Sequence, residues 1–241
     1  MPNRSIDNWK DVYYSRFSML KIRKQLLFLA LFSIVGFITL QIPFNKVMGS
    51  NVSFTLFDFF GPIAGGFLGP VLGIVSVLGV ELFNLFVKQT PLTTGSIIRL
   101  FPILFAVLYF ALIHKKAAQG KWLLIVPLFC IAAFIAHPIG RQVPYYALMF
   151  WLIPVIAYFK KDNLFVKSLG STFTAHSVGG AAWIWAFNLP ASVWNNLIPV
   201  VIAERILFAA GIAASYILVK YTLTFLISKK ILPKPEFNAL F

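Results

Sequence analysis

The chain has 241 residues, of which 59% are hydrophobic and only 12% are charged, about half the charged share of a soluble domain. With a mean hydropathy of +0.84, it is too apolar to stay disordered or to cover a soluble core with polar surface, so we expect an integral membrane protein. The net charge of +14 comes from basic residues scattered among apolar runs, a pattern that indicates contact with anionic headgroups of the lipid bilayer and argues against nucleic-acid binding.

Residues 1–24 form a polar, basic leader in which Trp9, Tyr13 and Tyr14 stand among lysines and arginines. No small-residue cleavage site follows the first apolar run, so we do not expect a signal peptide. Two interpretations of the leader stay open: a helix lying at the membrane interface, or a cytoplasmic leader with interfacial aromatic side chains. At the other end of the chain, residues 229–241 are expected to form a cytoplasmic tail.

Residues 25–228 are expected to form a single transmembrane domain, in which each spanning helix needs about 20 apolar residues. The run over residues 54–87 is too long for one span and is interrupted at Gly69-Pro70, where proline can begin a second helix of a hairpin. The sequence therefore predicts an all-α, polytopic helical bundle. Two runs, 122–136 and 145–159, are short, so six and eight spans both remain open. The expected helices are Gln25–Phe44, Phe54–Leu68, Pro70–Val87, Ile97–Ile113, Trp122–Ala136, Tyr145–Phe159, Leu169–Phe187 and Pro199–Ile227.

The placement of lysine and arginine predicts the orientation of these helices. With eight spans, the basic clusters of the leader, of residues 115–121 and 160–167, and of the tail fall on one side of the membrane. Three loops on the other side hold one basic residue each, Lys46, Lys88 and Arg141, and the loop near residues 188–198 holds none. The richer side is expected to be cytoplasmic, which places both termini there, and removing the short pair of helices does not change this result.

Small residues recur at helical spacing in two places. Gly61, Gly65, Gly69 and Gly73 follow one another every four residues, and such a pattern permits close approach of helix backbones. A second small-residue patch in the last span includes Ala209 and Ala213. For both patches, tight internal packing and a surface for sliding or partner docking are the two alternatives.

Ionisable residues inside membrane spans are costly, so a functional role is the first hypothesis for them. Most of those in this chain are expected in the outer half of the membrane, where they would suit an outward-facing pocket; His176 is expected in the inner half of its span. Glu204 is expected roughly 8 Å beyond the start of its helix. Arg205, the next residue, should point about 100° away, so the two side chains are not expected to face one spot. The candidate pocket residues are Asp58, Glu81, Asn84, Arg99, Trp183, Asn195 and Glu204.

Two alternatives compete with this pocket. The charges could form structural ion pairs, such as Arg99 with Glu81 or Asp58. The tryptophans near the outer end of their span, Trp183 among them, could cover a flat ring ligand or could belong to the interfacial aromatic belt.

Catalytic signals are weak. The sequence has no G-x-x-x-x-G-K-[ST] and no H-E-x-x-H motif, and its three histidines, His114, His137 and His176, lack helical ligand spacing. We therefore expect no catalytic site, metal or cofactor. An intramembrane enzyme using Glu81, His137, His176 or Glu204, and a structural or assembly protein, remain the alternatives to solute binding.

The stretch Phe54–Phe86, FTLFDFFGPIAGGFLGPVLGIVSVLGVELFNLF, resembles the second and third spans of the substrate-binding S components of energy-coupling-factor (ECF) vitamin transporters. The matching residues of the G-G-x-x-G-P turn and the following helix are Gly65, Gly66, Gly69, Pro70 and Gly73. The resemblance covers a minor part of the chain. The family typically has six spans, and its docking motif A-x-x-x-A is replaced in the first span by Ala30, Ser33 and Gly36.

This resemblance implies the outline of a function. The chain would be the subunit of an uptake transporter that captures a small vitamin or precursor from outside and releases it by toppling. Its partners would be a membrane coupling subunit and two cytoplasmic ATPase subunits, in the plasma membrane of a prokaryote. The start Met1-Pro2-Asn3 argues against the cobalt and nickel branch, whose members use an amino-terminal Met-x-His type ligand.

Overall fold

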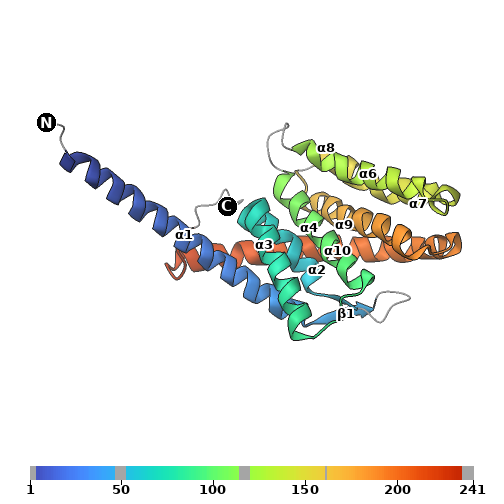
Figure 1. The fold of residues 1–241 in the computed structure, drawn as a ribbon, viewed down its shortest axis with the longest axis horizontal. Coiled ribbons are helices and arrows are strands. Elements are labelled where there is room, and N and C mark those ends of the chain that lie inside the picture. The colour runs from blue at the N-terminus through green and yellow to red at the C-terminus, as the bar shows by residue number, and fades with distance from the viewer. Residues whose placement is uncertain (1–3, 47–52, 114–119, 161, 235–241) are drawn as a thin grey trace.

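The computed structural model describes residues 4–46, 53–113, 120–160 and 162–234, with side chains from residue 22 onward apart from those of residues 45 and 46. The described chain is predominantly helical, so the all-α expectation is confirmed, with one small antiparallel pair of strands added to it (Figure 1). The helices are α1 (Arg4–Leu40), α2 (Phe57–Phe60), α3 (Ala64–Val87), α4 (Thr94–Leu112), α6 (Trp122–Ala136), α7 (Pro144–Trp151), α8 (Ile153–Phe159), α9 (Leu164–Phe187) and α10 (Ala191–Ser228). The strands are β1 (Pro43–Lys46) and β2 (Ser53–Thr55), and short 3₁₀ turns occupy Gly61–Ile63 and Gly140–Gln142.

Four helical stretches of the described chain are long and apolar enough to cross a membrane: Ile22–Leu40, Phe57–Val87, Thr94–Leu112 and Ala191–Ser228. Two shorter apolar segments, Trp122–Ala136 and Pro144–Phe159, fall below that length. These lengths support a membrane protein, while the number of spans stays a prediction. The backbone of the leader is continuous with that of the first span, because α1 runs without a break from Arg4 to Leu40. The aromatic side chains of the leader lie outside the described residues.

The chain reverses direction at Gly69-Pro70, inside the stretch assigned to α3. Gly69 has φ 81° and ψ 177°, a conformation that glycine adopts without steric cost. A Cβ atom added to Gly73 would lie 3.0 Å from the backbone of Ala64 and Gly65, whereas residues eight apart on a straight helix are separated by about 12 Å. The expected helical hairpin is therefore present. Its first arm begins later than predicted, since Ser53–Thr55 form a strand and the helix starts at Phe57.

Three further boundaries correct the sequence predictions. The expected helix Tyr145–Phe159 is divided into α7 and α8, because Pro154 at the start of α8 lacks the N–H that a continuous helix would use. Helix α9 begins earlier than expected, capped by the side chain of Asn163, which accepts the N–H of Val166 at 3.1 Å. His176 therefore lies near the middle of its helix and not in the inner half.

The last helix begins at Ala191 and not at Pro199, which α10 accommodates inside the helix. Trp194 and Asn195, expected in a loop, consequently lie in the first turns of α10. Glu204 lies about 20 Å along this helix instead of roughly 8 Å, at the usual rise per residue. It is thus placed deep in the bundle.

Helix α9 is the centre of the packing, with contacts to α4, α6, α8 and α10. The hydroxyl of Ser171 donates to the carbonyl oxygen of Ala106 on α4 at 2.9 Å, and α9 carries further buried serines and threonines. One apolar cluster joins α1, α3, α4 and α10, and a second joins α6 through α10. In Figure 1, α6 and α7 cover α9 on one side, while α1 extends away from the rest of the molecule.

Hydrogen bonds and packing contacts sort the helix ends into two groups. At one end, Gln41 donates to Asn84 at 3.0 Å, and His137 bonds to Asn188 at 2.9 Å. Gly95 at the start of α4 lies beside Phe187 at the end of α9, which brings these contacts to the same end. At the opposite end, Gly120 lies beside Tyr158. We call the first the polar end of the bundle and the second its basic end.

Candidate functional site

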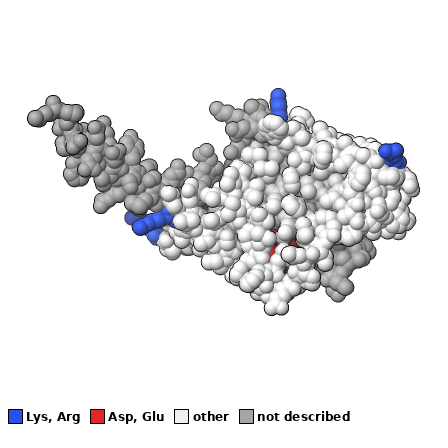
Figure 2. All heavy atoms as spheres, viewed as in Figure 1, with Lys and Arg blue, Asp and Glu red and all other residues white. Residues whose placement is uncertain are grey.

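Four of the predicted pocket residues lie close enough to one another to interact electrostatically. Asp58 on α2 lies within electrostatic range of Arg99, Glu81 and Glu204, and Arg205 acts on Asp58 and Glu204. We call Asp58, Glu81, Arg99, Glu204 and Arg205 the charge cluster. On the face shown in Figure 2, the described surface is almost entirely uncharged, and acidic atoms appear in a small recess near its centre.

Arg205 is the most buried member of the charge cluster, with 7% of the residue exposed. Its Nη1 atom donates to Thr172 Oγ1 at 3.2 Å, and its Nη2 atom lies 3.6 Å from Glu204 Oε2. The expectation that Glu204 and Arg205 could not face one spot is therefore wrong. The Cα–Cβ directions of the two neighbours diverge, but their long side chains are flexible enough to curve toward each other.

Aromatic rings lie beside the guanidinium group of Arg205. Its Cζ atom is 4.2 Å from the ring centre of Phe208 and 5.5 Å from that of Phe54, distances at which a ring attracts a cation. Phe44 and Phe59 complete this aromatic group, with ring centres 4.6 Å apart. The β1–β2 pair supplies two of the four rings, Phe44 and Phe54, so the strands bring aromatic side chains to α10.

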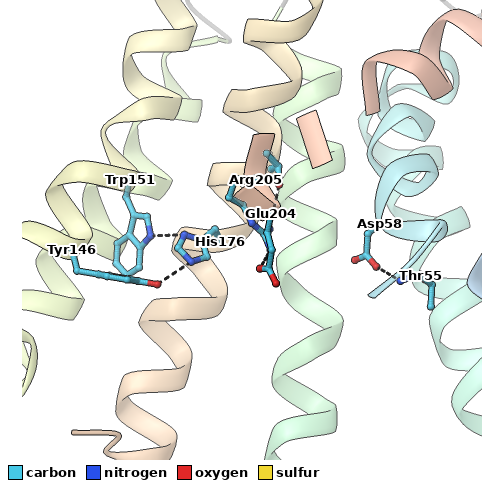
Figure 3. Close-up of polar contacts among 8 residues, drawn as sticks. Thr55, Asp58, Tyr146, Trp151, His176, Glu204 and Arg205 are labelled. Atoms are coloured by element: carbon cyan, nitrogen blue, oxygen red, sulfur yellow. Dashed lines mark hydrogen bonds and ion pairs between the residues drawn. The ribbon is translucent and has the colours of Figure 1, made fainter. Parts of the chain in front are cut away.

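His176 on α9 is held between two side chains from α7 (Figure 3). The indole Nε1 of Trp151 donates to His176 Nδ1 at 3.1 Å, and His176 Nε2 lies 3.2 Å from the hydroxyl of Tyr146. Since an indole N–H can only donate, Nδ1 must be unprotonated, and the ring hydrogen is on Nε2. His176 is thus a neutral imidazole that donates to Tyr146, which itself lies within electrostatic range of Arg205 and Glu204.

The remaining predicted pocket residues make other contacts. Asn84 accepts the hydrogen bond from Gln41, which ties α3 to α1, and the exposed Asn195 accepts from the hydroxyl of Tyr145 at 2.6 Å. Trp183 packs against Phe187, with ring centres 4.4 Å apart, and lies beside Gly95 on α4. Trp183 therefore lies beside a glycine one helical turn before Arg99 on α4, whereas Phe54 and Phe208 lie beside Arg205.

The carboxylates of the charge cluster are only partly partnered. Asp58 accepts the backbone N–H of Thr55, just before α2, at 2.8 Å. The Glu81 carboxylate makes no hydrogen bond or ion pair within the part of the chain that the structure describes. At 3.6 Å the Glu204–Arg205 contact is an ion pair that is too long for a hydrogen bond.

The glycines of the hairpin lie in internal contacts. A Cβ at Gly61 would lie 2.7 Å from Ile103, and a Cβ at Gly65 would overlap the carbonyl oxygen of Val107, both on α4. Gly73 packs on the other arm of the hairpin, and Gly69 makes the turn. On α10, Ala209 is fully buried and Ala213 is half-buried. These contacts agree with tight internal packing, one of the two alternatives for the small residues. A role of the same residues in partner docking stays a prediction.

Several residues of this region were not predicted as site residues. Arg205 stood out as a charge in a span, yet it was set aside because only backbone directions were considered. Tyr146 and Phe54 gave no signal, since aromatic residues are abundant in the sequence. His176 was assigned to the wrong depth because the start of its helix was placed too late.

The described residues do not form a metal site. They contain no group of three or more His, Cys, Asp and Glu side chains arranged to hold an ion. His137 bonds to Asn188 and His176 to the α7 side chains, so these two histidines belong to separate networks.

Comparison with known proteins gives one relative. The chain is 26% identical over 211 residues to an uncharacterized protein of Methanocaldococcus jannaschii, and the match covers 79% of this chain and 69% of the relative. No family model and no solved structure matches the chain. This similarity assigns no activity to the chain.

Proposed function

We propose that the protein is a membrane-embedded subunit of an uptake transporter that binds a small solute at the charge cluster. The observation that carries the proposal is Arg205, a nine-tenths buried guanidinium whose Nε atom has no hydrogen-bond partner among the described residues. A buried donor without an acceptor costs about 1–3 kcal/mol. A bound solute would supply that acceptor.

Incomplete pairing of the charges favours solute binding over a structural role. Ion pairs that only hold helices together in a membrane should be fully satisfied, because the low dielectric makes unpaired charges costly. Asp58, Glu81 and Arg99 make no ion pair with one another within 4.0 Å among the described side chains. They lie within electrostatic range of one another without neutralising each other in pairs, which favours a binding role over a structural one.

The proposed topology has six to eight spans, with the polar end of the bundle outside. Basic residues stand next to helix ends at the basic end: Lys121 precedes α6, Lys160 follows α8 and Lys229 follows α10. This placement supports a cytoplasmic location for that end and for both termini. The charge cluster would then open outward. The hairpin at Gly69-Pro70, on which the resemblance to ECF S components rests, supports a vitamin or precursor as solute and a coupling subunit with two ATPase subunits as partners, in a prokaryotic plasma membrane.

Native mass spectrometry of the gently purified full chain tests this function. Wild-type protein should retain a small molecule, and Glu81→Gln should reduce its occupancy. Because Glu81 makes no hydrogen bond or ion pair that the structure describes, this substitution should leave thermal unfolding unchanged. The matched control is Asp162→Asn, which neutralises an exposed acid at the basic end and should retain the solute.

Two results would contradict the proposal. An empty wild-type protein, in every mild detergent and in nanodiscs, would favour a structural role. A solute retained equally by wild type and Glu81→Gln would show that it binds elsewhere. Co-purification of the wild-type chain with ATPase subunits tests the partner assignment separately.

A further inference from the structure

The guanidinium group of Arg205 makes a single hydrogen bond among the described residues, and its acceptor is Thr172 on α9. Nη1 donates to Thr172 Oγ1 at 3.2 Å, whereas Nη2 lies 3.6 Å from Glu204 Oε2 and Nε has no partner. The rings of Phe54 and Phe208 attract the cation without fixing the direction of its N–H bonds. Thr172 therefore supplies the contact that sets how the guanidinium is turned.

The shape of a guanidinium group links the Thr172 contact to the orphan donor. The group is planar, and its N–H bonds point in fixed directions within the plane. Nε and Nη2 share one edge of this plane, and Nη1 lies on the other side of Cζ. With Nη1 held by Thr172, the Nε–Nη2 edge is the one left for another acceptor. The proposed function places the solute at this edge.

Thr172 differs from the other hydroxyl-bearing residues of α9 in the use of its hydroxyl group. It accepts a hydrogen bond from a side chain of another helix, and it is only 2% exposed. Threonine is β-branched and has few side-chain rotamers in a helix, so its oxygen is a well-fixed acceptor. The other hydroxyl groups of α9 donate to backbone carbonyl oxygens: those of Ser168, Ser171, Thr174 and Ser177.

A fixed acceptor on α9 has a consequence for binding through Arg205. An arginine side chain has several rotatable bonds and loses conformational entropy when it is held in one orientation. The hydrogen bond to Thr172 holds that orientation in the empty protein, so the solute does not have to order the side chain when it binds. Preorganisation of this kind raises affinity without adding a contact to the ligand.

From these contacts, and resting on the proposed function, the structure assigns Thr172 the role of a positioning residue of the solute site. Its hydroxyl holds Arg205 by Nη1 and thereby directs the Nε–Nη2 edge toward the solute. Thr172 acts on the solute through Arg205.

Four substitutions separate this role from a general effect on α9. Thr172→Val removes the hydroxyl group at nearly constant shape, and Thr172→Ala removes it without placing a methyl group against the guanidinium. Thr172→Ser keeps the hydroxyl group and should behave as wild type. Thr174→Val is the matched control, because it makes the same change on the same helix at a hydroxyl that donates to Gly170 O at 2.7 Å.

The first measurement follows Arg205 itself, by ¹⁵N NMR of the full chain labelled with ¹⁵N-arginine in nanodiscs. The signals of Arg205 are assigned by their loss in Arg205→Lys. A held guanidinium gives separate Nη1 and Nη2 resonances, and one that rotates about the Nε–Cζ bond gives an averaged resonance. We expect separate resonances in wild type, Thr172→Ser and Thr174→Val, and averaged resonances in Thr172→Val and Thr172→Ala.

The second measurement is native mass spectrometry of the same variants, with the molecule that wild type retains as the probe. The ratio of bound to free protein should fall about five- to tenfold in Thr172→Val and Thr172→Ala, the equivalent of one buried hydrogen bond. It should stay at the wild-type value in Thr172→Ser and Thr174→Val.

The two measurements together distinguish this inference from the proposed function. Averaged resonances with a lowered ratio in both deletion variants, and recovery of both in Thr172→Ser, support the inference. Separate resonances in the deletion variants, a wild-type ratio in them, or an equal fall in Thr174→Val would overturn it. In each of these cases wild type still retains its solute, and the proposed function stands. A wild-type chain that retains no molecule ends the proposed function and this inference with it.

Discussion

Gly65→Ala should destabilise the protein strongly, because this glycine of α3 packs directly against the backbone of α4. The added Cβ would overlap the carbonyl oxygen of Val107, lie 3.0 Å from its carbonyl carbon and 3.1 Å from the Cβ of Ala111. Val107 contributes backbone atoms to this contact, so a side-chain rotation cannot relieve it. The two helices must separate instead.

The magnitude follows from the burial of the surrounding contact. Ile63, Phe67, Val107 and Phe110 are each 2% exposed or less, and moving the helices apart loosens their packing. Overpacked sites of this kind cost about 1–3 kcal/mol, and we expect the upper end of this range because the clash is with backbone. For a chain of this length, that corresponds to a decrease in Tm of about 6–12 °C.

Thermal unfolding followed by tryptophan fluorescence in detergent measures the effect. Gly79→Ala is the matched control on the same helix, since a Cβ there meets nothing within 4 Å and alanine favours the helix by about 1 kcal/mol. Gly69→Ala has equal space but a φ of 81° with a ψ of 177°, a region that is essentially restricted to glycine, and it should cost about 1–3 kcal/mol through backbone strain alone. If Gly65→Ala unfolded at the same temperature as Gly79→Ala, the described contact between α3 and α4 would be wrong.

Three other substitutions test individual contacts by the same unfolding measurement. Arg205→Met should cost about 3 kcal/mol because it leaves Glu204 in the bundle without its partner; adding Glu204→Gln should recover most of that loss, and a double variant no better than the single one would exclude the pair. The hydroxyl groups of Ser33 and Ser76 are 3.0 Å apart, so a double-mutant cycle with alanine should give a coupling of about 0.6 kcal/mol, and additive effects would refute the bond. Tyr109→Phe should cost about 1 kcal/mol by removing a buried hydrogen bond between α4 and α8, and no change in Tm would contradict that contact.

The helical elements were largely predictable because their signals are local. The expected helix Trp122–Ala136 agrees with α6 at both ends, and the Gly69-Pro70 break was read from two residues. The boundaries that failed depended on competing local effects. Pro199 looked like a helix start, yet α10 continues through it, and residues 53–55 looked like the start of a helix but pair with Pro43–Lys46 as strands.

The site was predictable only in part. Asp58, Glu81, Arg99 and Glu204 stand out in sequence because charges are rare in apolar runs, and the structure brings them into one cluster. Asn84 and Asn195 were grouped with them by depth alone. Both face other helix ends, since depth fixes the level of a residue but not the direction of its side chain around the helix axis.

The sequence by itself determined the membrane character, the helical segments, the hairpin and the rare charges, because composition and short-range periodicity are properties of neighbouring residues. Only the tertiary structure decided that Arg205 joins Glu204, that Phe54 and Phe208 lie beside it, and that Trp151 fixes the tautomer of His176. Those contacts join different helices, or neighbours whose Cα–Cβ directions diverge. They depend on how each helix is rotated and packed and on how far side chains reach, which no local pattern specifies.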